Sequence, residues 1–268
     1  MHSISINNKM IPLPPRGSGA PPARMSRRLA EPRKIDKARM YAPASYGRRH
    51  LKRGEVLYRV TDKFASIYVV HIGCFKTVQM RTDGRHQVIR FDMPGDVMGF
   101  EAIGGAAHIC TAVALEDSEI FVIPYSRLSY GGHDGLPLQR QFHKFMSREI
   151  NRQHGTMLIL GTMSASDRLA RNLLNLSERF ADLGYSPSEF HLRMTRQDIG
   201  SYLGLTIETV SRILSKLQQA DLIAVDHRHI RILDIVSLAD FPAQQSTDRL
   251  HGRRGPAPLT APPHQTAD

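Results

Sequence analysis

Cysteine and long apolar runs are scarce in this sequence, and their scarcity excludes several classes of protein. Two cysteines in 268 residues do not make the disulfide framework of a small secreted protein. No apolar run approaches the ~20 residues that a membrane span needs, and no apolar stretch follows the first charges as in a secretory signal. We therefore expect a cytoplasmic protein without membrane contact.

Recognisable catalytic arrangements are also missing. The sequence shows no nucleophile paired with a base and no glycine-rich loop that would hold a phosphate, so we predict that the protein is not an enzyme. His71 and Cys74 would point to opposite faces of a strand, which argues against a metal site. Cys74 and Cys110 stay candidates for redox-sensing thiols or for a thiol-based redox enzyme, although buried inert cysteines are more common on strands.

Acidic residues are scarce only at the start of the chain. Residues 1–53 carry thirteen of the 36 Lys and Arg residues and two acidic ones, Glu31 and Asp36, so they account for the net charge of +11. Residues 1–45 and 246–268 are rich in proline and lack sustained periodicity, which predicts disorder. The basic character therefore belongs to the leading segment and not to the folded body.

The most informative segment runs from Thr195 to Leu222, TRQDIGSYLGLTIETVSRILSKLQQADL. It predicts two short helices with a tight break between them. Thr195 and Asp198 occupy the positions of a capping box, Gly204 supplies the turn, and Thr206 can cap the second helix. The pattern predicts a helix-turn-helix, a motif that binds DNA. The alternative is an ordinary helical hairpin with a solvated polar face.

The second helix of this pair has two distinct faces. Its apolar positions, which recur at helical spacing, are Val210, Ile213, Leu214 and Leu217. On the opposite face, we predict that Arg212 bonds guanine O6 and N7, that Glu208 accepts from cytosine N4, and that Ser211 lies near a thymine. Contacts with the DNA backbone are predicted for Thr195, Arg196, Thr206, Thr209, Lys216 and Arg228.

The rest of the chain predicts a β-rich domain, a long helix and a wing. Short β-type runs with glycine-marked turns are typical of a barrel or jelly roll. A helix over 138–163 carries an apolar seam that predicts dimerisation, unless the seam packs only on its own β-domain. The predicted dimer residues are Phe142, Met146, Ile150, Gln153, Met157 and Leu160. The expected α+β domains are 1–45 (disordered), 46–136 (β-barrel sensor), 137–165 (dimerisation helix), 166–245 (winged helix-turn-helix) and 246–268 (disordered).

This order of elements resembles the Crp–Fnr superfamily of transcription regulators. The resemblance covers about residues 50–240 and rests on GDVMGFEAIG (95–104), LSERFADLGYSPSEF (176–190) and MTRQDIGSYLGLTIETVSR (194–212). These motifs are similar to the Fnr/FixK branch, whose E-x-x-S-R signature falls on Glu208, Ser211 and Arg212. The resemblance implies a cyclic-nucleotide-binding-like β jelly roll, a long dimerisation helix and a C-terminal winged helix-turn-helix.

Two departures from the superfamily argue against its known cofactors. Cyclic-nucleotide binders have a Gly-Glu pair and a later Arg-Ser, whose arginine holds the phosphate. Here Phe100 follows Gly99, and the later place reads HICT at 108–111, so cAMP is not expected. Oxygen-sensing Fnr members hold an iron–sulfur cluster with N-terminal cysteines and one cysteine in the β-domain. This N-terminus has no cysteine and Phe121 stands in the other place, so no cluster is expected.

The resemblance also implies the biological role. It implies a homodimeric regulator, an activator that contacts RNA polymerase and reads an inverted repeat with half-sites like TTGA. By the same resemblance, the target genes concern low-oxygen or nitrogen-oxide metabolism. The alternative from another class is a ligand- or thiol-redox-sensing module whose main output is a protein partner.

Overall fold

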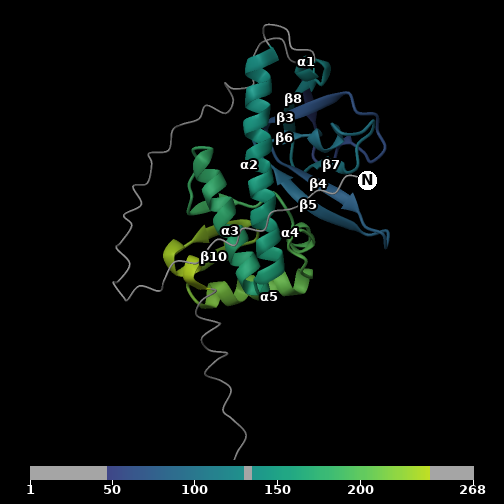
Figure 1. The fold of residues 1–268 in the computed structure, drawn as a ribbon. Helices are drawn as coiled ribbons and strands as arrows, with labels where there is room; N and C mark the ends of the chain where they lie inside the picture. Colours follow the sequence, from purple (N-terminus) through teal and green to yellow (C-terminus); the bar gives the residue numbers. More distant parts are fainter. Residues whose placement is uncertain (1–46, 130–134, 242–268) are drawn as a thin grey trace, which may run out of the picture. The chain divides into compact units, whose positions relative to one another are not determined.

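The computed structural model describes residues 47–129 and 135–241 (Figure 1). The segments expected to be disordered, 1–45 and 246–268, lie outside the described residues. Within the described ranges, no helix is long and apolar enough to cross a membrane. A β-rich domain comes first and a helical domain with a small sheet comes last, which is the α+β order expected from the sequence.

Two four-stranded antiparallel sheets form the β-domain, with strand orders β1-β8-β3-β6 and β2-β7-β4-β5. The strands are β1 (Gly47–Leu51), β2 (Val56–Tyr58), β3 (Ser66–Ile72), β4 (Phe75–Met80), β5 (His86–Asp92), β6 (Val97–Met98), β7 (Thr111–Ala114) and β8 (Ser118–Pro124). One apolar cluster joins the sheets, with Val70 and Ile120 from the first and Phe75 and Ala112 from the second. Neighbouring residues of β3 and β8 pack on opposite faces. Val70 and Ile120 belong to this cluster, and Val69 and Phe121 belong to a second one.

The long helix α2 (Gly135–Thr162) follows two short elements, η2 (Phe100–Ala102) and α1 (Ser126–Ser129). Successive residues of a helix turn by about 100°, so Phe142, Met146, Ile150 and Met157 lie within about 80° of one another, on one side of α2. Phe142 and Met146 pack against a cluster of the chain's own β-domain. Ile150 and Met157 lie farther along the same side of the helix, and 50% and 70% of their surface is exposed. Of the remaining predicted dimer residues, Gln153 is exposed and Leu160 is half-buried.

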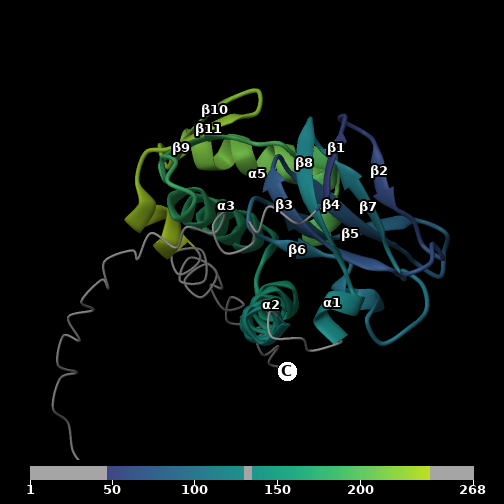
Figure 2. The same cartoon turned by 90° about the horizontal axis from the view of Figure 1, so that it is seen from above.

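The C-terminal domain contains α3 (Ala165–Asp182), α4 (Arg196–Leu203), α5 (Ile207–Gln219) and the strands β9 (Glu189–His191), β10 (Ile223–Asp226) and β11 (His229–Ile232). Its sheet has the order β10-β11-β9, so the expected wing hairpin gains a third strand (Figure 2). Leu173, Ile199, Val210 and Leu217 are almost fully buried in its core. A final short helix at 235–241 adds the buried Leu238.

Candidate nucleic-acid interface

Helix α4 begins with the capping box that the sequence predicts. The Thr195 Oγ1 accepts a hydrogen bond from the Asp198 backbone N–H at 3.0 Å. In return, the Asp198 carboxylate accepts from the Thr195 backbone N–H at 2.9 Å. The helix ends at Gly204, whose φ of 66° is left-handed and suits a residue without a Cβ. Local chemistry therefore fixes both ends of the first helix of the motif.

The turn between α4 and α5 is tight because Gly200 has no side chain. A Cβ at Gly200 would lie 2.7 Å from the Leu205 carbonyl oxygen, a distance that real Cβ atoms do not reach. That absence lets the Leu205 N–H donate to the Gly200 carbonyl at 2.8 Å. Thr206 then caps α5 by accepting from the Thr209 N–H at 3.2 Å. The angle of α5 against α4 is thus built into the backbone.

The polar face of α5 presents the three predicted base-reading side chains. Glu208 and Arg212 are exposed and Ser211 is half-buried. The backbone N–H of Glu208 and the Thr206 hydroxyl lower the pKa of the Glu208 carboxyl, so it remains an ionised acceptor at neutral pH. The Ser211 hydroxyl accepts from Arg196 Nη1 at 3.1 Å, so the predicted backbone contact Arg196 touches the reading face itself.

A groove of about 360 Å³ lies beside this face, between α5 and the start of α3. Thr209, Arg212 and Lys216 line it from α5, and Ser164 and Ser166 line it from the start of α3. Hydroxyls and cationic side chains are the groups that contact phosphates in protein–DNA complexes. The sequence analysis did not predict that these two serines contact DNA. Ser164 and Asp167 form a capping box, and the three-residue spacing of that motif is visible in the sequence.

The remaining predicted backbone contact lies at the tip of the wing. Asp226 pairs with His229 across the hairpin, so His227 and Arg228 form a two-residue turn. His227 takes a left-handed φ of 51°, which histidine adopts more readily than most residues. Arg228 is half-buried, and its carbonyl accepts from the Leu192 N–H at 2.8 Å. The wing therefore holds Arg228 close to the strand that precedes α4.

Helix α4 is docked on strands β4 and β5 of the β-domain. Lys76 Nζ lies 2.6 Å from Asp198 Oδ1, and the Val88 N–H donates to the Ser201 hydroxyl at 2.9 Å. The rings of Phe91 and Tyr202 meet edge to face at 5.3 Å between centroids. Burial alone would raise the pKa of Asp198, but hydrogen bonds from Lys76 and Thr195 outweigh it and lower that pKa. This docking was not predicted from the sequence, because its partners lie far apart in the chain.

The two cysteines, which the sequence left as candidate redox thiols, are both buried. Burial raises the pKa of Cys74 to about 12. Burial and the nearby Glu101 carboxylate also raise the pKa of Cys110. Because the thiolate is the reactive form, both environments oppose redox sensing. No cluster of His, Cys, Asp and Glu residues suited to a metal occurs in the part of the chain that the structure describes.

Comparison with known proteins agrees with this geometry. The Crp-like helix-turn-helix domain matches residues 167–241, and the cyclic nucleotide-binding domain matches residues 48–129. Transcriptional regulatory protein btr of Bordetella pertussis is 41% identical over 73% of this chain and 81% of its own length. Transcriptional activator protein Anr of Pseudomonas protegens is 40% identical over 71% of this chain and 78% of its own.

A solved structure is also similar to this protein in its fold. FixK2 from Bradyrhizobium japonicum is 29% identical, with a TM-score of 0.66, and the match covers 73% of this chain and 96% of that protein. The two matched domains, the related sequences and this fold are those of regulators and not of enzymes. The chain belongs to the Crp–Fnr family of DNA-binding transcription regulators, in the Fnr/FixK branch.

Proposed function

We propose that the protein acts as a homodimeric activator that reads an inverted repeat with half-sites like TTGA. The observation that carries this proposal is the exposed stripe of Glu208, Ser211 and Arg212 on a capped and tightly turned helix. Arg212 is suited to bond guanine O6 and N7, Glu208 to accept from cytosine N4, and Ser211 to lie near thymine. Two such helices, one from each subunit, would read the two half-sites.

The exposed face of α2 supports dimerisation. Ile150 and Met157 stand one above the other on it, and Leu158 beside them is 64% exposed. An apolar stripe on an otherwise polar helix is the pattern that a second copy of the helix buries. Gln153, which is neutral, lies next to this stripe, so no like charges need to meet across the two-fold axis. Phe142 and Met146 contribute by holding α2 on the β-domain.

The names of related proteins support the physiological part of the proposal. They include the fumarate and nitrate reduction regulatory protein of Escherichia coli and the anaerobic regulatory protein of Pasteurella multocida. We propose that this protein likewise serves low-oxygen or nitrogen-oxide metabolism in the cytoplasm and activates by contact with RNA polymerase. We further propose that it needs neither cAMP nor an iron–sulfur cluster. Phe100 follows Gly99, and HICT at 108–111 has no arginine for the phosphate of cAMP. The only two cysteines of the sequence, which are both buried, are too few for the cluster.

The test compares binding to a TTGA inverted repeat with binding to random DNA of the same length at the same salt concentration. Arg212→Ala should cost about 1–3 kcal/mol on the specific site and much less on random DNA. Lys216→Ala is the matched control: it removes a cation one turn beyond Arg212 on the same helix, which is predicted to contact the DNA backbone. It should weaken binding to both DNAs alike. Equal losses of affinity for Arg212→Ala on both DNAs would show that Arg212 contacts only phosphate.

A further inference from the structure

The hairpin of β4 and β5 carries exposed positive charge at its tip. Strand β4 ends at Met80 and β5 begins at His86, and the turn between them contains Arg81 and Arg85. The Arg81 N–H donates to the Arg85 carbonyl at 2.8 Å, so the two residues pair across the hairpin and their side chains share one face. Those side chains are 54% and 79% exposed. The tip therefore presents two guanidinium groups to solvent.

Asp83 is the only acidic residue between Met80 and His86, and one carboxylate does not balance two arginines. Its Oδ2 lies 3.6 Å from Arg81 Nε and 3.0 Å from Arg85 Nη2. Its Oδ1 accepts from the Arg85 N–H at 3.0 Å, a hydrogen bond that lowers the pKa of Asp83 and helps to close the turn. Ion pairs as exposed as these contribute little, so the guanidinium groups can exchange them for another anion. The tip keeps one positive charge in excess.

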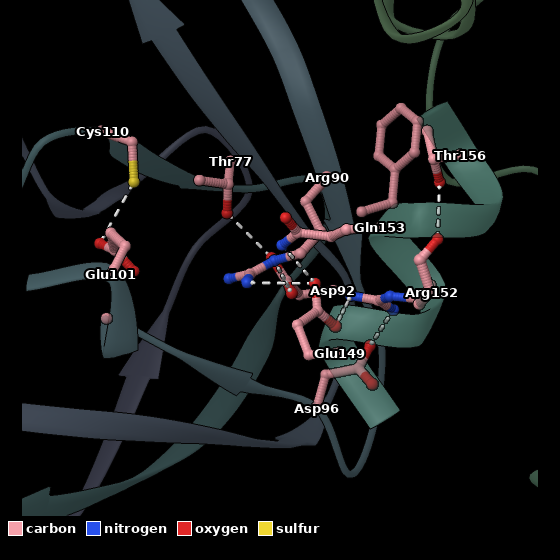
Figure 3. A network of polar contacts seen from close by, with 12 residues as sticks. Thr77, Arg90, Asp92, Asp96, Glu101, Cys110, Glu149, Arg152, Gln153 and Thr156 are labelled. Carbon is pink, nitrogen blue, oxygen red and sulfur yellow. Dashed lines mark hydrogen bonds and ion pairs between the residues drawn. The ribbon is translucent and has the colours of Figure 1, made fainter. Parts of the chain in front are cut away.

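The base of the hairpin is fixed on α2 by a buried ionic network. Arg90 of β5 lies with its Nε 2.6 Å from Asp92 Oδ1 and with its Nη1 3.7 Å from Glu149 Oε1 on α2. Thr77 of β4 donates to Asp92 Oδ2 at 2.9 Å. Figure 3 shows these strand residues facing Glu149 and Arg152 of the helix. Both strands of the hairpin therefore start from a fixed base.

Between its base and its tip, the hairpin rests on α4. Near the base, Lys76 Nζ lies 2.6 Å from Asp198 Oδ1 in the first turn of that helix. Farther out, the Val88 N–H donates to the Ser201 hydroxyl at 2.9 Å, and the Gln87 side chain donates to the Ser201 carbonyl. The hairpin thus follows α4 from its first turn toward its C-terminal end. Figure 1 shows the two strands, drawn in blue, extending past this helix.

The register of the hairpin places both arginines on the side that faces α4. Side chains two residues apart on a strand share a face. Arg85 is two residues from Gln87, whose side chain reaches Ser201, and Arg81 is paired with Arg85. Two residues extend a strand by about 7 Å. The two arginines therefore lie beyond Ser201 along the hairpin, toward the end of α4 at Leu203.

The exposed side of α4 lies between α5 and the hairpin. Gln197 is the exposed residue of this side. Helix geometry places it about 40° from Ser201, which contacts the hairpin, and about 60° from Gly200, which packs on the turn before α5. In a helix-turn-helix the first helix crosses the DNA backbone and the second enters the major groove. The backbone that passes α4 is therefore flanked by α5 on one side and by the hairpin on the other.

We propose that the β4–β5 hairpin is a second DNA-contacting element, in which Arg81 and Arg85 bind backbone phosphates next to those that α4 contacts. Residues 166–245 carry nine Lys and Arg residues and ten Asp and Glu residues, so the C-terminal domain has no excess of positive charge for a polyanion. Guanidinium groups suit phosphate oxygens because they bind them through two parallel hydrogen bonds. Such contacts hold the β-domain on DNA and carry no base sequence. The proposal rests on DNA binding by α4 and α5 and not on the TTGA half-site.

DNA binding at several salt concentrations tests the proposal. The full-length wild type and the double variant Arg81→Gln/Arg85→Gln are compared on a duplex with the TTGA inverted repeat at its centre, from 50 to 200 mM salt. Each lost phosphate contact should reduce the slope of the logarithm of the binding constant against the logarithm of the salt concentration by ~0.9, which is about 1.8 for each bound chain and about 3.6 for a dimer. Over this range, the affinity of a wild-type dimer should fall about 150-fold more than that of the variant dimer. The preferred base sequence should stay unchanged.

Two further double variants and a modified duplex tie the effect to the hairpin. Lys144→Gln/Arg148→Gln removes two exposed cations of α2, roughly 12–18 Å along the helix from Thr156, and should leave the slope unchanged. Arg81→Lys/Arg85→Lys keeps the positive charges and should keep most of the slope. Neutral methylphosphonates, which replace one phosphate at a time, locate the contacts. At those positions the wild type should lose affinity and Arg81→Gln/Arg85→Gln should not.

Three outcomes would overturn the proposal. They are an unchanged salt slope in Arg81→Gln/Arg85→Gln, an equal flattening in the α2 control, and a hairpin variant that binds DNA normally but is impaired in transcription by RNA polymerase. The last outcome would assign the tip to a protein partner. A wild-type protein without preference for the TTGA repeat would refute the proposed half-site instead, since the salt slope on any duplex that the protein binds still tests the hairpin.

Discussion

The docking of α4 on the β-domain predicts a measurable energetic coupling between Lys76 and Asp198. Their side chains are 27% and 9% exposed, so solvent screens the pair only in part. A hydrogen bond to a charged group contributes about 1.5–3 kcal/mol. Asp198→Asn removes the ion pair and also weakens the acceptor for Thr195, so it should cost about 2–3 kcal/mol of unfolding free energy. Lys76→Met removes the ion pair alone and should cost about 1–2 kcal/mol.

A double-mutant cycle isolates the pairwise energy. Urea unfolding of the wild type, both single variants and the double variant should give a coupling of about 1.5 kcal/mol for Lys76 and Asp198. Lys52 and Asp117 provide a matched control, because their ion pair of 2.8 Å has side chains that are 82% and 64% exposed. Coupling in that exposed pair should be indistinguishable from zero. If the Lys76–Asp198 cycle gives no larger value than the control, α4 is not held on strand β4 in solution.

Three further predictions concern other parts of the molecule. Ile150→Glu should turn the dimer into a monomer and abolish operator binding, because it places like charges on the exposed stripe of the two subunits. Sedimentation in aerobic buffer measures the oligomeric state. A wild-type protein that is monomeric at micromolar concentration would contradict this prediction. Deleting residues 1–45 should flatten the dependence of the logarithm of the DNA-binding constant on the logarithm of the salt concentration, by ~0.9 for each phosphate that the segment neutralises. The preferred DNA sequence should stay unchanged. An unaltered slope would show that the segment does not touch DNA. With the pKa of Cys74 raised to about 12, only about one Cys74 thiol in ten thousand is ionised at pH 8. A disulfide reagent should therefore label the native protein no faster than the protein unfolds. Rapid labelling would restore the redox-sensing hypothesis.

The parts of the fold that the sequence predicted are those with local signals. Thr195 and Asp198 define a capping box within four residues, and Gly204 marks a helix end without reference to anything distant. The runs that became β3 and β8 are rich in β-branched and aromatic residues, which favour strands. Strand β6 has two residues, too few for any period, and β1 has four exposed residues out of five. Neither was predicted, because neither carries an apolar pattern.

The parts that the sequence did not predict depend on contacts between distant residues. Nothing near Arg90 in the chain indicates that Glu149 faces it, since the pair is formed by packing α2 on β5. The same holds for Lys76 and Asp198. The apolar pattern of α2 suggests a single seam. Only the packed structure shows that Phe142 lies against the β-domain, whereas Ile150, about two turns farther along the helix, is exposed. The proposed base-reading residues were accessible from the sequence because helix periodicity alone places them opposite the buried stripe.

The contacts that α2 makes with the β-domain and with α4 limit how its length can change. Phe145 packs on the β-domain, and about three turns later Thr156 meets the Tyr202 hydroxyl of α4 at 3.3 Å. One inserted residue between them would rotate everything beyond it by about 100°, turning Thr156 away from Tyr202 and Met157 off the exposed stripe. Seven inserted residues would nearly restore the rotation but shift α4 by roughly 10 Å along the axis. This stretch can therefore change its side chains during evolution, but it cannot gain or lose residues without uncoupling the β-domain from the DNA-binding domain.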